Sequence, residues 1–83
     1  MPQTYLIINT HEPEQCEPME ADMDRLPEDL KGKDFYCTCP HGLHGYYLFV
    51  DAESSDQAID HPPPSFRMGS TRAQPLEVIR LPS

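Results

Sequence analysis

Apolar residues concentrate in three short runs whose composition and alternation predict β-strands. The first run, 4–10, is rich in aromatic and β-branched residues and stops before Pro13, because proline cannot continue a central strand. The second, 34–39, alternates apolar and polar positions, and the third, 46–50, is the most continuous. The proline- and glycine-containing segment 40–45 joins the last two, which predicts a hairpin.

Helical spacing follows the first and third strands. Met19, Met23, Leu26 and Leu30 are four, three and four residues apart and trace one helical face. Because Pro27 breaks this pattern, we expect an interrupted helix over 18–31, ended by Gly32.

A second, shorter helix is expected after the third strand. Ser54 or Ser55 is its expected N-cap, 56–60 its body, and the prolines at 62–64 end it. The apolar residues at 76–81 predict the last strand, which follows a turn at Gly69.

The order β-α-β-β-α-β predicts one α+β domain over 1–83, with the ferredoxin-like fold and a four-stranded antiparallel sheet. Right-handed crossovers make the first strand parallel to the second, and the third parallel to the fourth. The ends of the first two strands and the starts of the last two therefore share one edge of the sheet. We expect His11, Cys39, His41, His44 and the 69–72 turn to meet there.

Both faces of this sheet are predicted to be apolar. In the third strand Tyr46, Leu48 and Val50 alternate with Tyr47 and Phe49. Since two short helices can cover only one face, we expect the other face to pack on a second copy of the chain in a homodimer.

Three segments together resemble the ferredoxin-like dimeric α/β-barrel superfamily. They are Tyr5-Leu-Ile-Ile-Asn-Thr-His11-Glu-Pro-Glu-Gln-Cys16, Cys39-Pro-His41-Gly-Leu-His44-Gly-Tyr46 and Met68-Gly-Ser-Thr71. More narrowly, they resemble small uncharacterised bacterial and archaeal proteins with a Thr-His-x-Pro-Glu-x-Cys motif. The superfamily includes monooxygenases, isomerases, dehalogenating enzymes and binding proteins, so the resemblance implies a fold and a dimer rather than one activity.

The stretch from Cys37 to His44 holds two thiols and two imidazoles, which are ligands that suit zinc. Because Cys37-x-Cys39 is not a standard chelating spacing, we assign Cys37 to packing. The metal set we predict is His11, Cys39, His41 and His44, with Cys16 as an alternative ligand. Zinc is the first choice, with copper and nickel left open. In the simpler interpretation, His41 and His44 are solvated loop residues.

Two other functions remain compatible with the sequence. His11 could serve as the acid or base of a cofactor-free isomerase or oxygenase, with Tyr46 and Arg72 binding a small-molecule ligand. Alternatively, the chain is a dimerising structural module with no site. The sequence favours a binding protein over an enzyme without deciding between them.

Composition excludes several partners. The chain has 14 acidic and 6 basic residues and a formal charge of −8, which disfavours binding to nucleic acid or to an anionic membrane surface. The first residues lack a signal peptide's basic start and long apolar run. Three cysteines are an odd number, which favours reduced thiols, so we expect a cytoplasmic protein.

Overall fold

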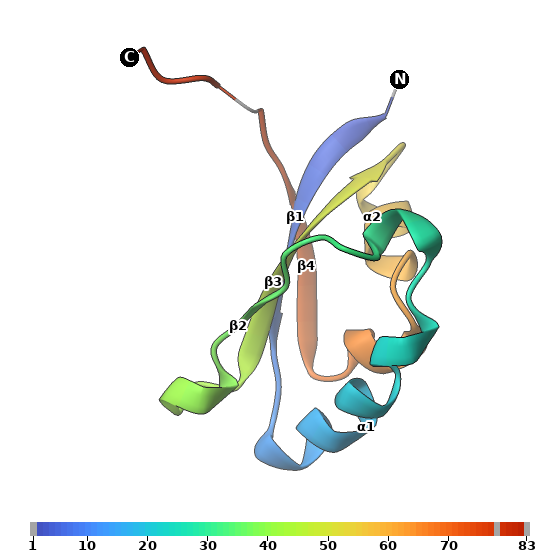
Figure 1. Ribbon diagram of the computed structural model, residues 1–83, viewed down its shortest axis with the longest axis vertical. Coiled ribbons are helices and arrows are strands. Elements are labelled where there is room, and N and C mark those ends of the chain that lie inside the picture. The colour runs from blue at the N-terminus through green and yellow to red at the C-terminus, as the bar shows by residue number, and fades with distance from the viewer. Residues whose placement is uncertain (1, 78, 83) are drawn as a thin grey trace.

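The computed structural model describes residues 2–77 and 79–82. In this part of the chain, four strands form one open antiparallel sheet in the order β2-β3-β1-β4 (Figure 1). Their bounds are β1 Gln3–Thr10, β2 Tyr36–Cys37, β3 Gly45–Ala52 and β4 Ser70–Pro75. The protein is therefore a small α+β domain, as predicted.

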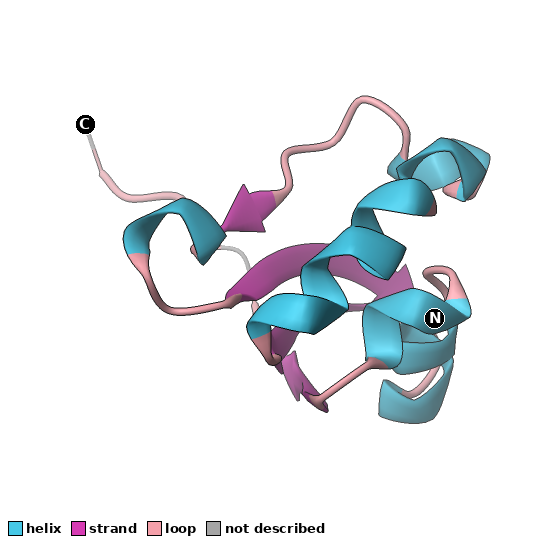
Figure 2. Cartoon of the chain, turned by 90° about the horizontal axis from the view of Figure 1, so that it is seen from below, coloured by secondary structure: helices cyan, strands magenta, loops and turns pink. Residues whose placement is uncertain are grey.

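The helices are short and are joined by loops (Figure 2). Over residues 2–77 and 79–82, the α-helices are α1 (Cys16–Ala21) and α2 (Ser55–Asp60). Single turns of 3-10 helix make up η1 (Pro13–Gln15), η2 (Met23–Arg25), η3 (Glu28–Leu30), η4 (Cys39–His41) and η5 (Pro64–Arg67). Among the described residues, no helix has the length and apolar character that crossing a bilayer requires.

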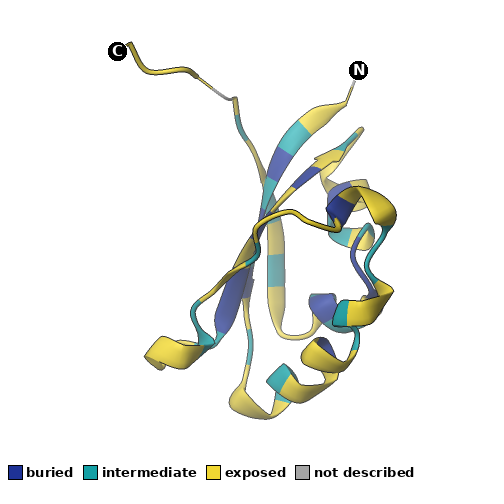
Figure 3. Cartoon of the chain, in the orientation of Figure 1, coloured by how far each residue is buried: buried dark blue, intermediate teal, exposed yellow. Residues whose placement is uncertain are grey.

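One face of the sheet carries the core, and both α-helices lie on that side (Figure 1). The buried positions alternate along β1 and β3 (dark blue in Figure 3), because successive side chains of a strand point to opposite faces. The helices and loops contribute the rest of the core. Its buried apolar members are Tyr5, Ile7, Met19, Leu30, Tyr46, Leu48, Val50, Ala58 and Phe66.

The opposite face is left open, as the two short helices led us to expect. Tyr36, Tyr47 and Phe49 are 49%, 39% and 40% exposed. Leu6, directly opposite Phe49 in the β1–β3 ladder, lies with them along a shallow groove.

The shared sheet edge is confirmed by the strand register. Thr10, at the end of β1, pairs with Gly45 at the start of β3 and with Ser70 at the start of β4. Cys37, at the end of β2, pairs with Tyr46. Residues that follow β1 and precede β3 are therefore neighbours.

The region predicted as one interrupted helix is broken more than once. It divides into α1, η2 and η3, and the backbone is extended at Leu26 and Pro27. Gly32 follows η3 with φ +81°, a conformation that costs glycine little. Ser54 is confirmed as the N-cap of α2, where its Oγ accepts from the Gln57 N–H at 3.2 Å.

Two strand predictions need correction. The last strand runs over Ser70–Pro75 and not over 76–81; position 78 of the predicted range lies outside the described residues. Ile79 and Leu81, which made that range look like a strand, are 75% and 82% exposed. The second strand, predicted over 34–39, is only Tyr36–Cys37, because Cys39 already begins the η4 turn.

Candidate metal centre

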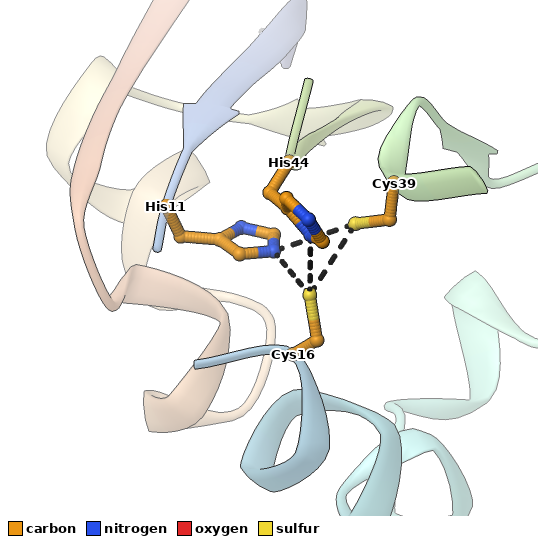
Figure 4. Close-up of side chains that lie close together, drawn as sticks. All are labelled: His11, Cys16, Cys39 and His44. Atoms are coloured by element: carbon orange, nitrogen blue, oxygen red, sulfur yellow. Dashed lines mark hydrogen bonds between the residues drawn. The ribbon is translucent and has the colours of Figure 1, made fainter. Parts of the chain in front are cut away.

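Four side chains that can bind a metal converge at the shared sheet edge (Figure 4). His11, Cys16, Cys39 and His44 each offer one ligand atom, and these atoms all lie within 4.8 Å of one another. His11 directly follows β1, and His44 directly precedes β3. Cys16 is the first residue of α1 and Cys39 the first of η4. Four separate positions in the chain thus build one cluster.

Cys16 makes most of the contacts in this cluster. Its Sγ lies 3.1 Å from Nε2 of His11, 3.0 Å from Nδ1 of His44 and 3.5 Å from Sγ of Cys39. The Cys39 sulfur is also 3.5 Å from Nε2 of His11. In a tetrahedral zinc site, bond lengths of about 2.3 Å to sulfur and 2.0–2.1 Å to nitrogen give separations of about 3.5 Å (N–S) and 3.8 Å (S–S). The contacts of Cys16 would reach these separations by outward shifts of about half an ångström or less, whereas a pair at the 4.8 Å limit of the group would have to close by about 1 Å or more.

Strand pairing fixes the two histidines relative to each other. The ladder between β1 and β3 continues one step beyond Thr10, where the His11 N–H donates to the His44 carbonyl at 3.0 Å. The strands approach closely here because residue 45 is glycine. A Cβ at Gly45 would lie 2.3 Å from the Asn9 carbonyl oxygen, which is far inside van der Waals contact.

A tight turn after β1 returns Cys16 to the sheet edge. Pro13 takes the first position of η1, where its missing N–H costs nothing. Glu12 and Gln15 form a capping box, in which the Gln15 side chain accepts from the Glu12 N–H at 2.8 Å. Cys16 follows directly, so its place in the cluster depends on the geometry of this turn.

The loop before β3 holds Cys39 and His44. The Thr38 N–H donates to the Gly45 carbonyl at 3.1 Å, and the Thr38 hydroxyl donates to the carbonyls of Leu43 and Gly45. Gly42 closes η4 in the left-handed region, with φ +96°. Thr38 thus ties the two ends of this loop together beside the cluster.

Asn9 fixes the orientation of the His11 ring. It is 2% exposed, and its Nδ2 donates to the Met68 carbonyl and to the Thr71 hydroxyl, both at 2.8 Å. A carbonyl can only accept, so this contact sets which end of the amide is nitrogen. The Asn9 Oδ1 then faces Nδ1 of His11 at 2.6 Å and must accept its proton. His11 therefore holds its proton on Nδ1 and directs the Nε2 lone pair at the two sulfur atoms.

The surroundings also favour the neutral form of His11. Burial, and to a lesser degree the nearby His44, lowers the pKa of His11 below its ordinary value of 6.5. Neutral imidazole is the form that binds a metal. The cluster thus favours the ligating state of this side chain at neutral pH.

A cavity of about 150 Å³ borders the cluster on the side of α1. His11, Cys16 and Cys39 form one part of its wall, and most of its surface is apolar. The remaining lining residues are Met19, Glu20, Met23, Phe35, Cys37, Gly45 and Tyr46. A small molecule in this cavity would lie directly beside three of the four clustered residues.

The structure brings together three of the four residues in the predicted metal set. His11, Cys39 and His44 meet, whereas His41 is exposed and lies outside the group of four. Cys16, which the sequence left as an alternative, is the fourth member. The predicted role of Cys37 in packing is wrong, because Cys37 is exposed on the short edge strand β2.

The predicted pairing of Tyr46 with Arg72 around a ligand is also wrong. Tyr46 faces the core, where its hydroxyl donates to the Phe66 carbonyl at 2.7 Å and burial raises its pKa. Arg72 is paired with Ile8, the neighbour of Asn9, so it lies on the open face of the sheet. Opposite faces of one sheet cannot line a common pocket.

Sequence reasoning missed Asn9. A signal for this role is present in the sequence, since an asparagine occupies a core-facing position of β1 two residues before His11.

Comparison with protein-family models, curated proteins and solved structures gives no match. The geometry of the cluster is therefore the observation from which a function can be inferred.

Proposed function

We propose that this protein binds one transition-metal ion, with zinc as the first choice, through His11, Cys16, Cys39 and His44. The observation that carries the proposal is the mutual distance of 4.8 Å or less between four ligand atoms from four places in the chain. Two thiolates and two neutral imidazoles form a complete tetrahedral set for zinc. The locked Asn9–His11 contact supports it further, because ligating histidines commonly donate their second ring N–H to a fixed acceptor.

A set of four protein ligands is typical of structural zinc rather than catalytic zinc, which keeps a position open for water or substrate. A chain of 83 residues buries a modest core, so a bound ion would add usefully to its stability. The ion would hold the turn after β1 and the loop before β3 to the start of α1. We therefore infer a role in stabilising this end of the domain.

The test is the metal content of the untagged protein, measured by inductively coupled plasma mass spectrometry. We expect about one zinc ion per chain, a large loss in Cys39→Ser, and no loss in His41→Ala, since His41 is exposed outside the cluster. Metal content well below one ion per chain that is unchanged in Cys39→Ser would contradict the proposal. Titrating the metal-free protein with Zn²⁺, Cu⁺ and Ni²⁺ against competing chelators then identifies the preferred ion.

We further propose that the fold is ferredoxin-like and that the protein is a cytoplasmic homodimer. The antiparallel order β2-β3-β1-β4 and the two crossovers support the fold. The open apolar face with Tyr36, Tyr47 and Phe49 supports the dimer. Sedimentation equilibrium at micromolar concentration tests it: we expect a dimer that Phe49→Glu dissociates, and a monomeric wild type would contradict it.

One observation favours a second function, acid–base catalysis by His11. The cavity of about 150 Å³ borders this residue, whose pKa is lowered. Against it, Nδ1 of His11 is held by Asn9 and Nε2 contacts two sulfur atoms, which leaves neither nitrogen free for a substrate. Solution NMR of the zinc-loaded protein decides between them. A His11 ring that stays neutral across the titration range is expected for a ligand, and a ring that titrates freely supports the base.

A further inference from the structure

Two of the clustered residues are cysteines whose sulfur atoms are already in contact. Sγ of Cys16 and Sγ of Cys39 are 3.5 Å apart, and both thiols are free. A disulfide bond is about 2.05 Å long. Closing the gap between these atoms requires a movement of about 1.5 Å, the difference between the two distances. The structure thus holds a pair of thiols that is close to bonding distance without being bonded.

A path for a small oxidant reaches this pair. Cys16 and Cys39 both line the cavity of about 150 Å³, and neither is fully buried. A water molecule takes about 30 Å³ in the liquid, so a molecule the size of hydrogen peroxide fits inside. The cavity wall is mostly apolar, which suits an uncharged oxidant better than an ionic one.

We propose that Cys16 and Cys39 form a redox-controlled ligand pair, in which a hydroperoxide oxidises them to a disulfide and so releases the metal. The inference rests on the proposed metal site, because the same two sulfur atoms supply half of its ligands. With hydrogen peroxide, one thiolate attacks an oxygen atom and the O–O bond breaks, which gives a sulfenic acid and a hydroxide that takes a proton from solvent to become water. The second thiolate attacks the sulfenic sulfur, so that the S–S bond forms and the S–O bond breaks, and the departing hydroxide takes a second proton from solvent to become water. The sulfur atoms lose two electrons in all, and the peroxide takes up these electrons and two protons to give two molecules of water.

Loss of both thiolates would leave only His11 and His44 facing the ion. Two imidazoles are half of a tetrahedral set, so affinity for zinc should collapse on oxidation. A reductant that reopens the disulfide should restore the site. Since His11 and His44 are fixed by the β1–β3 ladder, they stay in place while the sulfur ligands change state.

Cys37 is the other thiol that could form a disulfide with Cys39. Its substitution therefore provides the matched control. It borders the same cavity and is exposed, but it lies on β2 outside the group of four. If Cys16 and Cys39 are the pair, Cys37→Ser should leave both zinc binding and oxidative release unchanged. If Cys37 is the true partner of Cys39, the same substitution should abolish the disulfide.

The experiment starts from reduced, zinc-loaded, untagged protein and its Cys37→Ser variant. Hydrogen peroxide is added, released zinc is followed with a chromogenic chelator, and disulfides are mapped by mass spectrometry of peptides. We expect release of about one zinc ion per chain, in step with a Cys16–Cys39 cross-link, in both proteins. A phosphine reductant, added after the peroxide is removed, should restore zinc binding to its starting level.

Three results would overturn the inference. They are retention of zinc under peroxide, release of zinc with a Cys37–Cys39 cross-link, and release with sulfinic acids but no cross-link. A protein that binds no zinc before oxidation would instead refute the proposed function, and the release step with it. Disulfide mapping of that metal-free protein would still show separately whether Cys16 and Cys39 pair.

Discussion

Replacing Asn9 by alanine should weaken metal binding, although Asn9 touches no metal. Its Oδ1 accepts the His11 Nδ1 proton at 2.6 Å, and this contact directs Nε2 toward the sulfur atoms. Without it, the His11 ring can rotate and exchange its tautomer. Losing such a partner of a ligating histidine typically costs about 10–100-fold in metal affinity, or about 1.4–2.7 kcal/mol.

The same substitution also lowers the stability of the metal-free protein. Asn9 makes three hydrogen bonds of 2.8 Å or less, to His11, Met68 and Thr71. At about 1 kcal/mol each, their loss should cost about 3 kcal/mol in the free energy of unfolding. A weaker metal site could therefore reflect a loosened fold, so the two effects must be separated.

Asn9→Asp separates them. A carboxylate still accepts the His11 proton, but it cannot donate to the Met68 carbonyl, so it should keep the affinity for zinc while losing stability. Chelator competition measures affinity, urea unfolding of the metal-free protein measures stability, and nitrogen chemical shifts of His11 report its tautomer. Equal losses of zinc affinity in Asn9→Ala and Asn9→Asp would refute the argument that Asn9 acts by orienting His11.

Three further predictions concern the same end of the sheet. Gly45→Ala should lower the free energy of unfolding in urea by about 1–3 kcal/mol and weaken zinc binding, because the new Cβ would lie 2.3 Å from the Asn9 carbonyl oxygen. An unchanged free energy of unfolding would contradict this close approach. Removing the metal with a chelator should lower the melting temperature by about 10 °C or more in differential scanning calorimetry, since a ligand at 100 times its Kd adds about 2.7 kcal/mol to the free energy of unfolding. An unchanged melting temperature would argue against the metal site. In the metal-free protein, the pKa of His11 lies below its unfolded value of 6.5. The unfolded chain therefore takes up this proton first, and stability should fall as the pH drops through 6.5 until the folded pKa is reached. His11→Gln should flatten this dependence in urea unfolding measured between about pH 7.5 and 5.5, and an equally steep fall in that variant would assign it to other groups.

Much of the architecture followed from local pattern. The first and third strands were predictable because apolar side chains alternate or run together there, and Ser54 because few residue types cap a helix well. The connection order then placed His11 beside the loop that carries Cys39 and His44. That step needed only the handedness of crossovers, which is a property of every chain of L-residues.

The last strand could not be found this way. Ser70–Pro75 lies at the edge of the sheet and carries only partly buried or exposed side chains, so it lacks an apolar signal. Its backbone pairing with β1 defines it as a strand. The strand was predicted at 76–81 instead, because that segment is more apolar, yet Ile79 and Leu81 are exposed.

The composition of the site was likewise decided in three dimensions. Sequence alone determined which ligand types were available and that His11, Cys39 and His44 would share one edge of the sheet. The tertiary structure chose Cys16 over His41, because the η1 turn folds α1 back onto that edge while η4 leaves His41 exposed. It also gave Asn9 its role, through partners some sixty residues away in the chain. Local pattern fixes which side chains face the core, but contacts between distant segments depend on how turns and strands pack, and those contacts determine this site.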